Sequence, residues 1–205
     1  MKYSNIACIL PIIAITACGS STPPTESYTD SSFEKVSATG TLAGLPLSSP
    51  VGALNETGID GNGYSIAVGL GSDNKYHGYA GIIQTGVIAS PPTTGSVVMS
   101  GKYYAALYTS ITETNGVPSG SSATDFNHDM TATIDFAAGT MIGEGDGQDL
   151  TINGTFSGTD INGTVTYFGV TGALDGILVP TQAIGIFHGH DDTMVYAGGF
   201  VIDAP

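Results

Sequence analysis

The stretch His128-Asp129-Met130-Thr131-Ala132-Thr133-Ile134-Asp135-Phe136-Ala137 decides the fold class, because its side chains alternate between apolar and polar. The apolar set, expected to face a core, is Met130, Ala132, Ile134 and Phe136. The polar set, expected to face solvent, is Asp129, Thr131, Thr133 and Asp135. A period of two is typical of a half-buried strand. The stretch therefore predicts one strand of an antiparallel sheet.

The rest of the chain repeats this theme in shorter pieces, with 30 glycines separating runs of Val, Ile, Thr, Tyr and Phe. Such spacing indicates an all-β protein with many strands. Further strands are expected at Tyr64–Leu70, Tyr76–Ile83, Ser96–Ile111 with a bulge near Gly101, Leu150–Phe156, Gly163–Val170, Gly176–Val179, Ala183–Phe187 and Met194–Ile202. Asx-Gly pairs, expected to form hairpin turns or bulges, are Asn115-Gly116, Asp146-Gly147, Asn153-Gly154, Asn162-Gly163 and Asp175-Gly176.

The segment Ser90-Pro91-Pro92-Thr93-Thr94-Gly95 marks an expected boundary, because Pro-Pro resists both helix and central strand. Residues 33–91 would form a short β-rich N-terminal region. Residues 92–205 would supply about eight strands, enough to close into a small antiparallel up-and-down β-barrel. Closure removes the strand edges that invite aggregation.

The first residues indicate export. One positive charge precedes an apolar run from Ile6 to Ala17, which is shorter than the roughly 20 residues of a membrane-spanning helix. Residues 1–17 are therefore interpreted as a signal peptide. The run ends in Ile15-Thr16-Ala17-Cys18, which resembles the bacterial lipobox. An ordinary signal peptide with an incidental cysteine is the alternative.

The lipobox resemblance implies that Cys18 carries two or three acyl chains such as palmitate, enough for stable anchoring. Residues 18–32 are then expected to be the lipidated cysteine and a disordered, Ser-, Thr- and Pro-rich tether. In a Gram-negative bacterium, glycine rather than aspartate at position 19 implies the outer membrane. Cys8 would leave with the signal, so no disulfide is expected in the mature domain.

The composition excludes one large class of partners. The formal net charge is −14, and all four basic residues are lysines. Binding to nucleic acid needs basic patches, so DNA and RNA are not expected as ligands. The acidic surface is compatible with cationic partners, but it also keeps an exported protein soluble.

Several segments resemble the β-barrel domain of transferrin-binding protein B and related surface lipoproteins. The matching stretches are Pro92-Thr93-Thr94-Gly95-Ser96, Met130-Thr131-Ala132-Thr133-Ile134-Asp135-Phe136, Leu150-Thr151-Ile152-Asn153-Gly154-Thr155-Phe156-Ser157-Gly158 and Gly198-Gly199-Phe200, with Gly176, Pro180, Ala183, Gly185 and Phe187 in the order of the family's closing motif. The resemblance covers residues 92–205 and implies the barrel. It departs where Ile177-Leu178 replaces an aromatic pair, where Val179 replaces a glycine, and where the family glutamate is absent. Transferrin binding is therefore not carried over.

One cluster has ligand chemistry, His188-Gly189-His190-Asp191-Asp192. In an extended segment His188, His190 and Asp192 point to the same side. Imidazole and carboxylate could hold zinc or another transition metal, or a histidine could ligate haem iron. A polar hairpin loop between the last two strands is the favoured interpretation, so no metal or other cofactor is predicted. His77 and His128 are expected to be surface or sheet positions.

Other patterns suggest no chemistry. Residues 143–149, Gly-Glu-Gly-Asp-Gly-Gln-Asp, lack the ligand spacing of calcium loops and predict a turn. The sequence contains no nucleophile elbow, phosphate-binding loop or zinc-protease helix motif, so an enzyme is not expected. Tyr103, Tyr104 and Tyr108 are expected in the core or barrel wall rather than on a binding face.

These observations favour a lipid-anchored outer-membrane protein on the cell surface, whose barrel binds an extracellular ligand without catalysis. The resemblance implies a host protein, haem or another iron source as that ligand. Two alternatives stay open. One is a structural or adhesion lipoprotein of the envelope. The other is a periplasmic metal-binding protein that uses His188 and His190.

Overall fold

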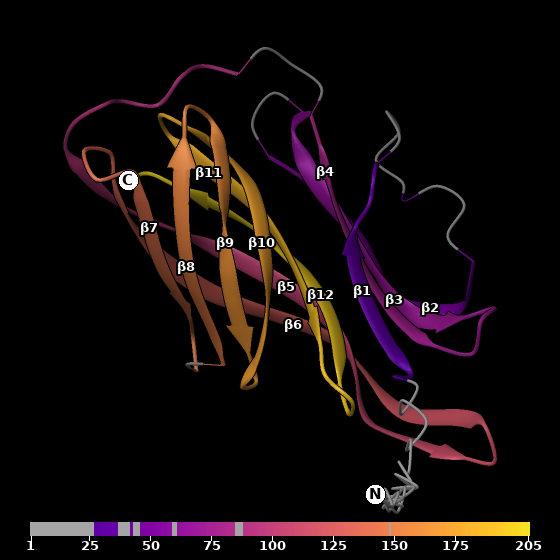
Figure 1. Cartoon of the computed structure of the whole chain (residues 1–205). Helices are drawn as coiled ribbons and strands as arrows, with labels where there is room; N and C mark the ends of the chain where they lie inside the picture. Colours follow the sequence, from indigo (N-terminus) through magenta and orange to yellow (C-terminus); the bar gives the residue numbers. More distant parts are fainter. Residues whose placement is uncertain (1–26, 37–41, 43–45, 59–60, 85–87, 148) are drawn as a thin grey trace, which may run out of the picture.

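The structure is a computed structural model that describes residues 27–36, 42, 46–58, 61–84, 88–147 and 149–205. It is an all-β protein with two sheets (Figure 1). The N-terminal sheet is built from β1 (Thr29–Phe33), β2 (Leu47–Thr57), β3 (Gly63–Gly71) and β4 (Tyr76–Ile83). The barrel is built from β5 (Ser96–Thr114), β6 (Val117–Asp135), β7 (Thr140–Gly145), β8 (Leu150–Ser157), β9 (Asp160–Tyr167), β10 (Val170–Val179), β11 (Gln182–His190) and β12 (Val195–Asp203). Within the described ranges, no helix has the length and apolar character needed to cross a membrane.

The second sheet is a closed barrel in the order β10-β11-β12-β5-β6-β7-β8-β9. Each strand pairs antiparallel with its neighbours in the chain, and β12 closes the ring by pairing with β5. The predicted eight-stranded up-and-down barrel is confirmed. The alternation predicted for 128–137 is also confirmed, because Met130, Ala132, Ile134 and Phe136 are buried in the barrel. Strand β6 itself is longer and begins at Val117.

Aromatic side chains fill the barrel interior. Tyr103, Tyr167, Tyr196, Phe187 and Phe200 are each at most 1% exposed. Glycines paired with two of these residues on the neighbouring strands β11 and β12 make room for the rings, since a Cβ built on Gly198 would lie 2.1 Å from the Phe187 ring and one on Gly185 would lie 2.1 Å from the Phe200 ring. The interior is therefore a packed core, as expected for eight strands.

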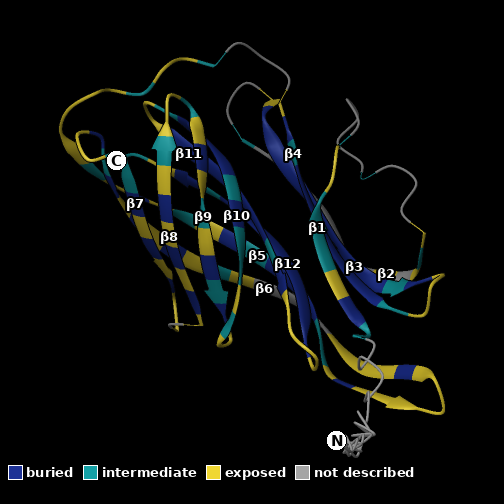
Figure 2. Cartoon of the chain, viewed as in Figure 1, coloured by how far each residue is buried: buried dark blue, intermediate teal, exposed yellow. Residues whose placement is uncertain are grey.

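The N-terminal sheet has the order β1-β4-β3-β2, with β1 parallel to β4, and it lies against the outer side of β5, β11 and β12 (Figure 1). A second apolar core fills this interface and includes Tyr64 and Ile66 from β3 and Ile184 and Val195 from the barrel. Strands β11 and β12 are thus buried on both faces, whereas exposed and buried residues alternate along β7, β8 and β9 (Figure 2). The barrel therefore has one covered wall and one bare wall.

The Asx-Gly pairs divide into two groups. Asn115-Gly116 forms the two-residue turn between β5 and β6, and Asp146-Gly147 lies between β7 and β8. The other pairs lie inside β8, β9 and β10, where the registers are continuous, so they are neither turns nor bulges. The predicted bulge near Gly101 is also wrong, because the register of β5 shifts only between Ala105 and Leu107 and between Thr109 and Thr112.

The first described strand lies partly within the predicted tether. Residues 29–32, expected to be disordered, belong to β1. This segment is polar because β1 is an edge strand, whose side chains form hydrogen bonds with the barrel and with neighbouring residues of the sheet. Strands β2 and β7 and the first half of β6 were not predicted, and the strand expected at Gly163–Val170 is wrong in its end, because β9 stops at Tyr167 and β10 begins at Val170.

Candidate functional site

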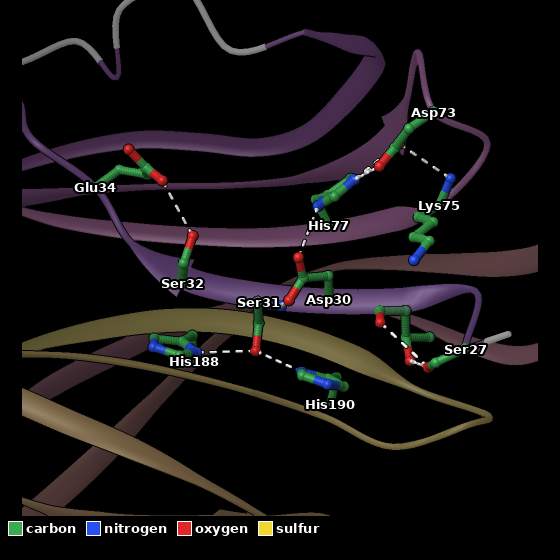
Figure 3. Close-up of polar contacts among 11 residues, drawn as sticks. Ser27, Asp30, Ser31, Ser32, Glu34, Asp73, Lys75, His77, His188 and His190 are labelled. Carbon is green, nitrogen blue, oxygen red and sulfur yellow. Dashed lines mark hydrogen bonds and ion pairs between the residues drawn. The ribbon is translucent and has the colours of Figure 1, made fainter. Parts of the chain in front are cut away.

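Three histidines gather where β1 lies between β4 and the barrel strand β11 (Figure 3). The Oγ atom of Ser31 lies 2.8 Å from Nδ1 of His188 and 2.8 Å from Nδ1 of His190. A serine hydroxyl has one proton, so with both imidazoles neutral it donates to one ring and accepts from the other. The two rings then carry their protons on different nitrogens. Ser31 thereby fastens β1 to the barrel.

His188 is held as the neutral imidazole. Burial, together with the neighbouring His190, lowers its pKa from 6.5 to about 4, although Asp30 opposes the shift. The Phe33 ring packs edge-on against the His188 ring at a centroid distance of 4.3 Å, which contributes to this apolar setting. A neutral His188 matches its role as a hydrogen-bonding partner of Ser31.

His77 joins β4 to two carboxylates. Its Nε2 atom lies 2.9 Å from Oδ1 of Asp73, and its Nδ1 atom lies 3.8 Å from Oδ2 of Asp30. Burial by itself would raise the pKa of the Asp73 carboxyl group. The hydrogen bonds with His77 and from the Lys75 amide together outweigh this effect, so the pKa lies below its ordinary value. Asp30 and Ser31 are adjacent on β1. Histidines therefore contact the strand from both sides.

The predicted metal candidates are only partly brought together. His188 and His190 converge on Ser31, whereas Asp192 lies in the exposed turn after β11. That turn is built by the Asp191 carboxylate, which accepts hydrogen bonds from the backbone amides of Thr193 and Met194. Among the residues that the structure describes, no group of three or more His, Cys, Asp and Glu side chains could hold a metal ion.

The remaining sequence candidates lie where packing predicts. His77 is a buried residue of β4, and His128 stacks on Tyr103 in the barrel at 5.8 Å. Tyr103 is part of the barrel core, and Tyr108 packs on Tyr76 at 4.6 Å. Tyr104 Oη accepts a hydrogen bond of 2.6 Å from the Asn127 amide. Cys8 and Cys18 lie outside the described residues.

A second candidate site, not predicted from the sequence, lies on the bare wall of the barrel. Two adjoining hollows of about 580 Å³ and 450 Å³ share Thr131 and Glu144 as lining residues. We call them together the outer groove. Its lining comes from β6, β7, β8 and the β7–β8 turn, and consists of Asp129, Met130, Thr131, Thr133, Ile142, Gly143, Glu144, Gly145, Asp146, Gly147, Thr151, Ile152 and Asn153.

The outer groove combines the exposed apolar side chain of Ile142 with negative charge. Ile142 is 63% exposed, and its cross-strand neighbour Thr133 pairs on its other side with Val98, which is 56% exposed. Asp129, Glu144 and Asp146 line one end of the groove. Lys102 is paired with Asp129 at 2.6 Å. The surface suits a ligand with an apolar centre and a cationic rim.

Two of the three strands that line this groove were predicted from the sequence. The outward positions of 128–137 include Thr131 and Thr133, and those of the predicted strand at 150 include Thr151 and Asn153. The strand between them, β7, was not recognised. Its inward positions include Gly143 and Gly145, where a Cβ on Gly145 would lie 2.6 Å from the Tyr103 ring. Glycine at inward positions hides the apolar alternation by which a strand is recognised.

No protein-family model matches the chain, and no curated protein matches it. Among solved structures, transferrin-binding protein B from serogroup B Neisseria meningitidis is similar at 13% identity and a TM-score of 0.46, covering 70% of this chain and 31% of that chain. The vaccine antigen transferrin-binding protein B from Haemophilus parasuis is similar at 13% identity and a TM-score of 0.46, covering 77% of this chain and 38% of that chain. The haemoglobin receptor HpuA from Kingella denitrificans is similar at 14% identity and a TM-score of 0.33, covering 77% and 69%.

The match thus spans about a third of the length of the two transferrin-binding proteins. The closed eight-stranded barrel expected from the sequence resemblance is present.

Proposed function

We propose that the chain is a lipid-anchored surface lipoprotein of the outer membrane, whose barrel binds an extracellular macromolecule without catalysis. One observation carries the binding mode. The barrel interior is filled by tyrosine and phenylalanine rings, while the bare wall outside carries the outer groove. A ligand would therefore be held on the outside of the barrel, by a surface, rather than enclosed within it.

The arrangement of the histidines supports a role without catalysis. His77 bonds to Asp73, and His188 and His190 bond to Ser31 at a junction between elements. The contacts of His188 and His190 fix β1 in place, and the contact of His77 joins β4 to the turn before it. Histidine as a general base needs a substrate within hydrogen-bond reach, and here the Nδ1 atoms of His188 and His190 face a structural hydroxyl.

The anchor part of the proposal rests on the sequence. Cys18 follows a lipobox-like segment, and the first described strand begins at Thr29. The 11 residue steps between them reach at most roughly 36–40 Å when extended. Such a tether would lift the barrel off the membrane while keeping it near the surface.

The ligand class rests on the sequence resemblance and on the charge of the groove. The resemblance implies a host protein or an iron source such as haem. The acidic rim of the outer groove supports a protein with basic side chains around an apolar contact. Among the similar structures, transferrin-binding protein B is named for transferrin as its ligand, and HpuA is a haemoglobin receptor.

Binding is tested with the full chain in detergent, using transferrin, haemoglobin and free haem as separate probes in biolayer interferometry. Ile142→Glu in the outer groove should weaken binding of the retained probe by about tenfold or more. Thr171→Glu is the matched control, because Thr171 is an exposed residue of β10 outside the groove lining. Equal binding by both variants would place the ligand elsewhere, and failure of all three probes would remove the iron-source proposal.

The anchor and location are tested separately. Metabolic labelling with a palmitate analogue should label the chain and fail to label Cys18→Ser. Protease added to intact cells should remove the protein from the surface. Resistance in intact cells with loss after permeabilisation would instead place it facing the periplasm.

A further inference from the structure

Three Asn-Gly pairs of the chain have exposed asparagine side chains but different backbones. Asn115-Gly116 forms a hairpin turn, whereas Asn153-Gly154 lies in the middle of β8 and Asn162-Gly163 in the middle of β9. The chain therefore presents the same dipeptide to solvent in two structural settings. The backbone setting is important because the glycine nitrogen of an Asn-Gly pair can attack the side chain of the asparagine.

We propose that Asn115 is a site of spontaneous deamidation. The backbone nitrogen of Gly116 attacks the side-chain carbonyl carbon of Asn115. The new C–N bond closes a succinimide ring, and the C–Nδ2 bond breaks. The amide nitrogen leaves as ammonia and carries away the proton lost by Gly116. Water then opens the ring at either carbonyl and leaves aspartate or isoaspartate.

The turn leaves this nitrogen accessible. Thr114 and Val117 form the last pair of the β5–β6 ladder, so Asn115 and Gly116 lie beyond it. Both residues have positive φ, 55° and 77°, as in a type I′ turn. A Cβ built on Gly116 would meet no atom within 4 Å. The space beside the Gly116 Cα is therefore open.

The Gly116 amide also faces a base. Its N–H donates a hydrogen bond to Oε1 of Glu113. This is the proton that must leave when the nitrogen attacks. A carboxylate held against a transferring proton acts as a general base. Glu113 is therefore a positioning and proton-accepting residue for the reaction.

The strand pairs are protected by their neighbours. Gly154 pairs with Gly163 on one side and with Met141 on the other, and Gly163 also pairs with Leu174. Ring closure requires the backbone at these positions to rotate, which would break ladders on both sides. A Cβ on Gly163 would lie 2.2 Å from the Asn153 carbonyl oxygen, so little space exists there for rotation.

Asn62-Gly63 is excluded on different grounds. Asn62 is only 5% exposed, and its carbonyl accepts a hydrogen bond from the Gly58 amide. Gly63 opens strand β3 and pairs with Ile83. Water, the second reactant, has little access to this asparagine.

The product would change the hairpin tip and leave the barrel intact. Aspartate adds one negative charge to a chain whose formal charge is −14. Isoaspartate also inserts a methylene into the backbone, which a two-residue turn accommodates poorly. The nearest buried residue of β5, Ile111, lies in the core under the N-terminal sheet and outside the reacting turn.

The test follows each asparagine by fragmentation mass spectrometry of the full chain, folded in detergent, at neutral and mildly alkaline pH. The same chain in denaturant is the reference, where the exposed pairs should react at similar rates. In the folded chain Asn115 should convert at least about tenfold faster than Asn153 and Asn162, because the ladder positions react only after local opening. Glu113→Gln should slow Asn115 by about tenfold in the folded chain and leave the denatured rate unchanged.

Two results would overturn the proposal. Asn115 could stay intact in the folded chain while the denatured chain reacts, or Asn153 or Asn162 could react as fast as Asn115 in the folded chain. A Glu113→Gln rate equal to or above the parent rate would remove Glu113 as the base. Slow reaction at Asn153 and Asn162 in Glu113→Gln verifies that the variant is folded.

Discussion

Ser31 and His188 are joined by a hydrogen bond of 2.8 Å across a separation of 157 residues. Ser31→Ala removes this bond and the matching bond to His190, leaving a half-buried imidazole with an unmet polar atom. The free energy of unfolding should fall by about 1–2 kcal/mol in urea denaturation.

Ser32→Ala is the matched control for this change. Ser32 is the next residue of β1. Among the described contacts, its hydroxyl forms a hydrogen bond only with the Glu34 carboxylate, and this bond is exposed to solvent. Ser32→Ala should lower the free energy of unfolding by less than about 0.5 kcal/mol. Equal losses in the two variants would show that the Ser31 contacts add nothing.

Acid should weaken the fold through His188. Its pKa is about 4 in the folded protein and 6.5 ordinarily, so the unfolded chain binds the proton more readily. The stability that the low pKa of His188 contributes is complete above pH 6.5 and is lost as the pH falls towards 4. After allowance for partial exposure, the loss should be about 1–2 kcal/mol.

The acid prediction is checked by urea denaturation across this pH range in the parent and in His188→Asn. The variant lacks the titrating group, so its stability should fall less steeply. Parallel curves for the two proteins would contradict the assignment to His188.

Alkali should unfold the barrel through its buried tyrosines. Burial raises the pKa of Tyr103 from 10.0 to about 12, with Asp149 and Asp146 adding to the effect, and burial also raises the pKa of Tyr167 and Tyr196. Groups with raised pKa stabilise the fold below pH 10 and lose that contribution as the pH rises through the folded value.

Tyrosinate absorbance and circular dichroism, recorded together, check the alkaline prediction. Part of the absorbance change should coincide with loss of the folded spectrum. In Tyr103→Phe the unfolding midpoint should move to higher pH if the lost contact is small. Complete titration of all tyrosines before unfolding would contradict the burial of these hydroxyls.

Gly198→Ala should be strongly destabilising. Its Cβ would lie 2.1 Å from the Phe187 ring and 2.7 Å from the Tyr104 carbonyl oxygen, so the packed interior must shift. Overpacking of this kind costs about 2–3 kcal/mol.

Gly154→Ala provides the comparison in thermal denaturation. Its Cβ would meet Leu174 and Ile161 side chains at 3.3 and 3.4 Å, which small adjustments can relieve. Its stability should change by less than about 1 kcal/mol. A similar loss of stability in both variants would show that contact with the Phe187 ring does not cause the destabilisation by Gly198→Ala.

The barrel could be predicted because its signal is local. The strand around Ile134 alternates cleanly, and β4 was predicted with its observed bounds, Tyr76–Ile83. Strand β7 could not be predicted because Gly143 and Gly145 occupy inward positions whose space is taken by neighbouring side chains, among them Tyr103. Such glycines are explained only by contacts across the barrel.

The junction between β1 and the barrel shows the same limit. The segment beginning at Thr29 is polar enough to resemble a tether, since its partners lie far away in the chain. The sequence brought His188 and His190 together as candidates for metal binding. It could not reveal that Ser31 lies between them, because local patterns contain no record of contacts over such separations.

Strand β1 also determines how the fold would respond to a pulling force from its N-terminal side. A pulling force applied to the chain at Ser27 would reach the folded body first through the five residues of β1. Because β1 runs beside β4 in the same direction, a pull along the strand axis loads its ladder in shear, so that its bonds must fail together rather than one after another. The contacts from Thr29 to the Asp191 carbonyl and from Ser31 to β11 divide that load between the sheet and the barrel wall.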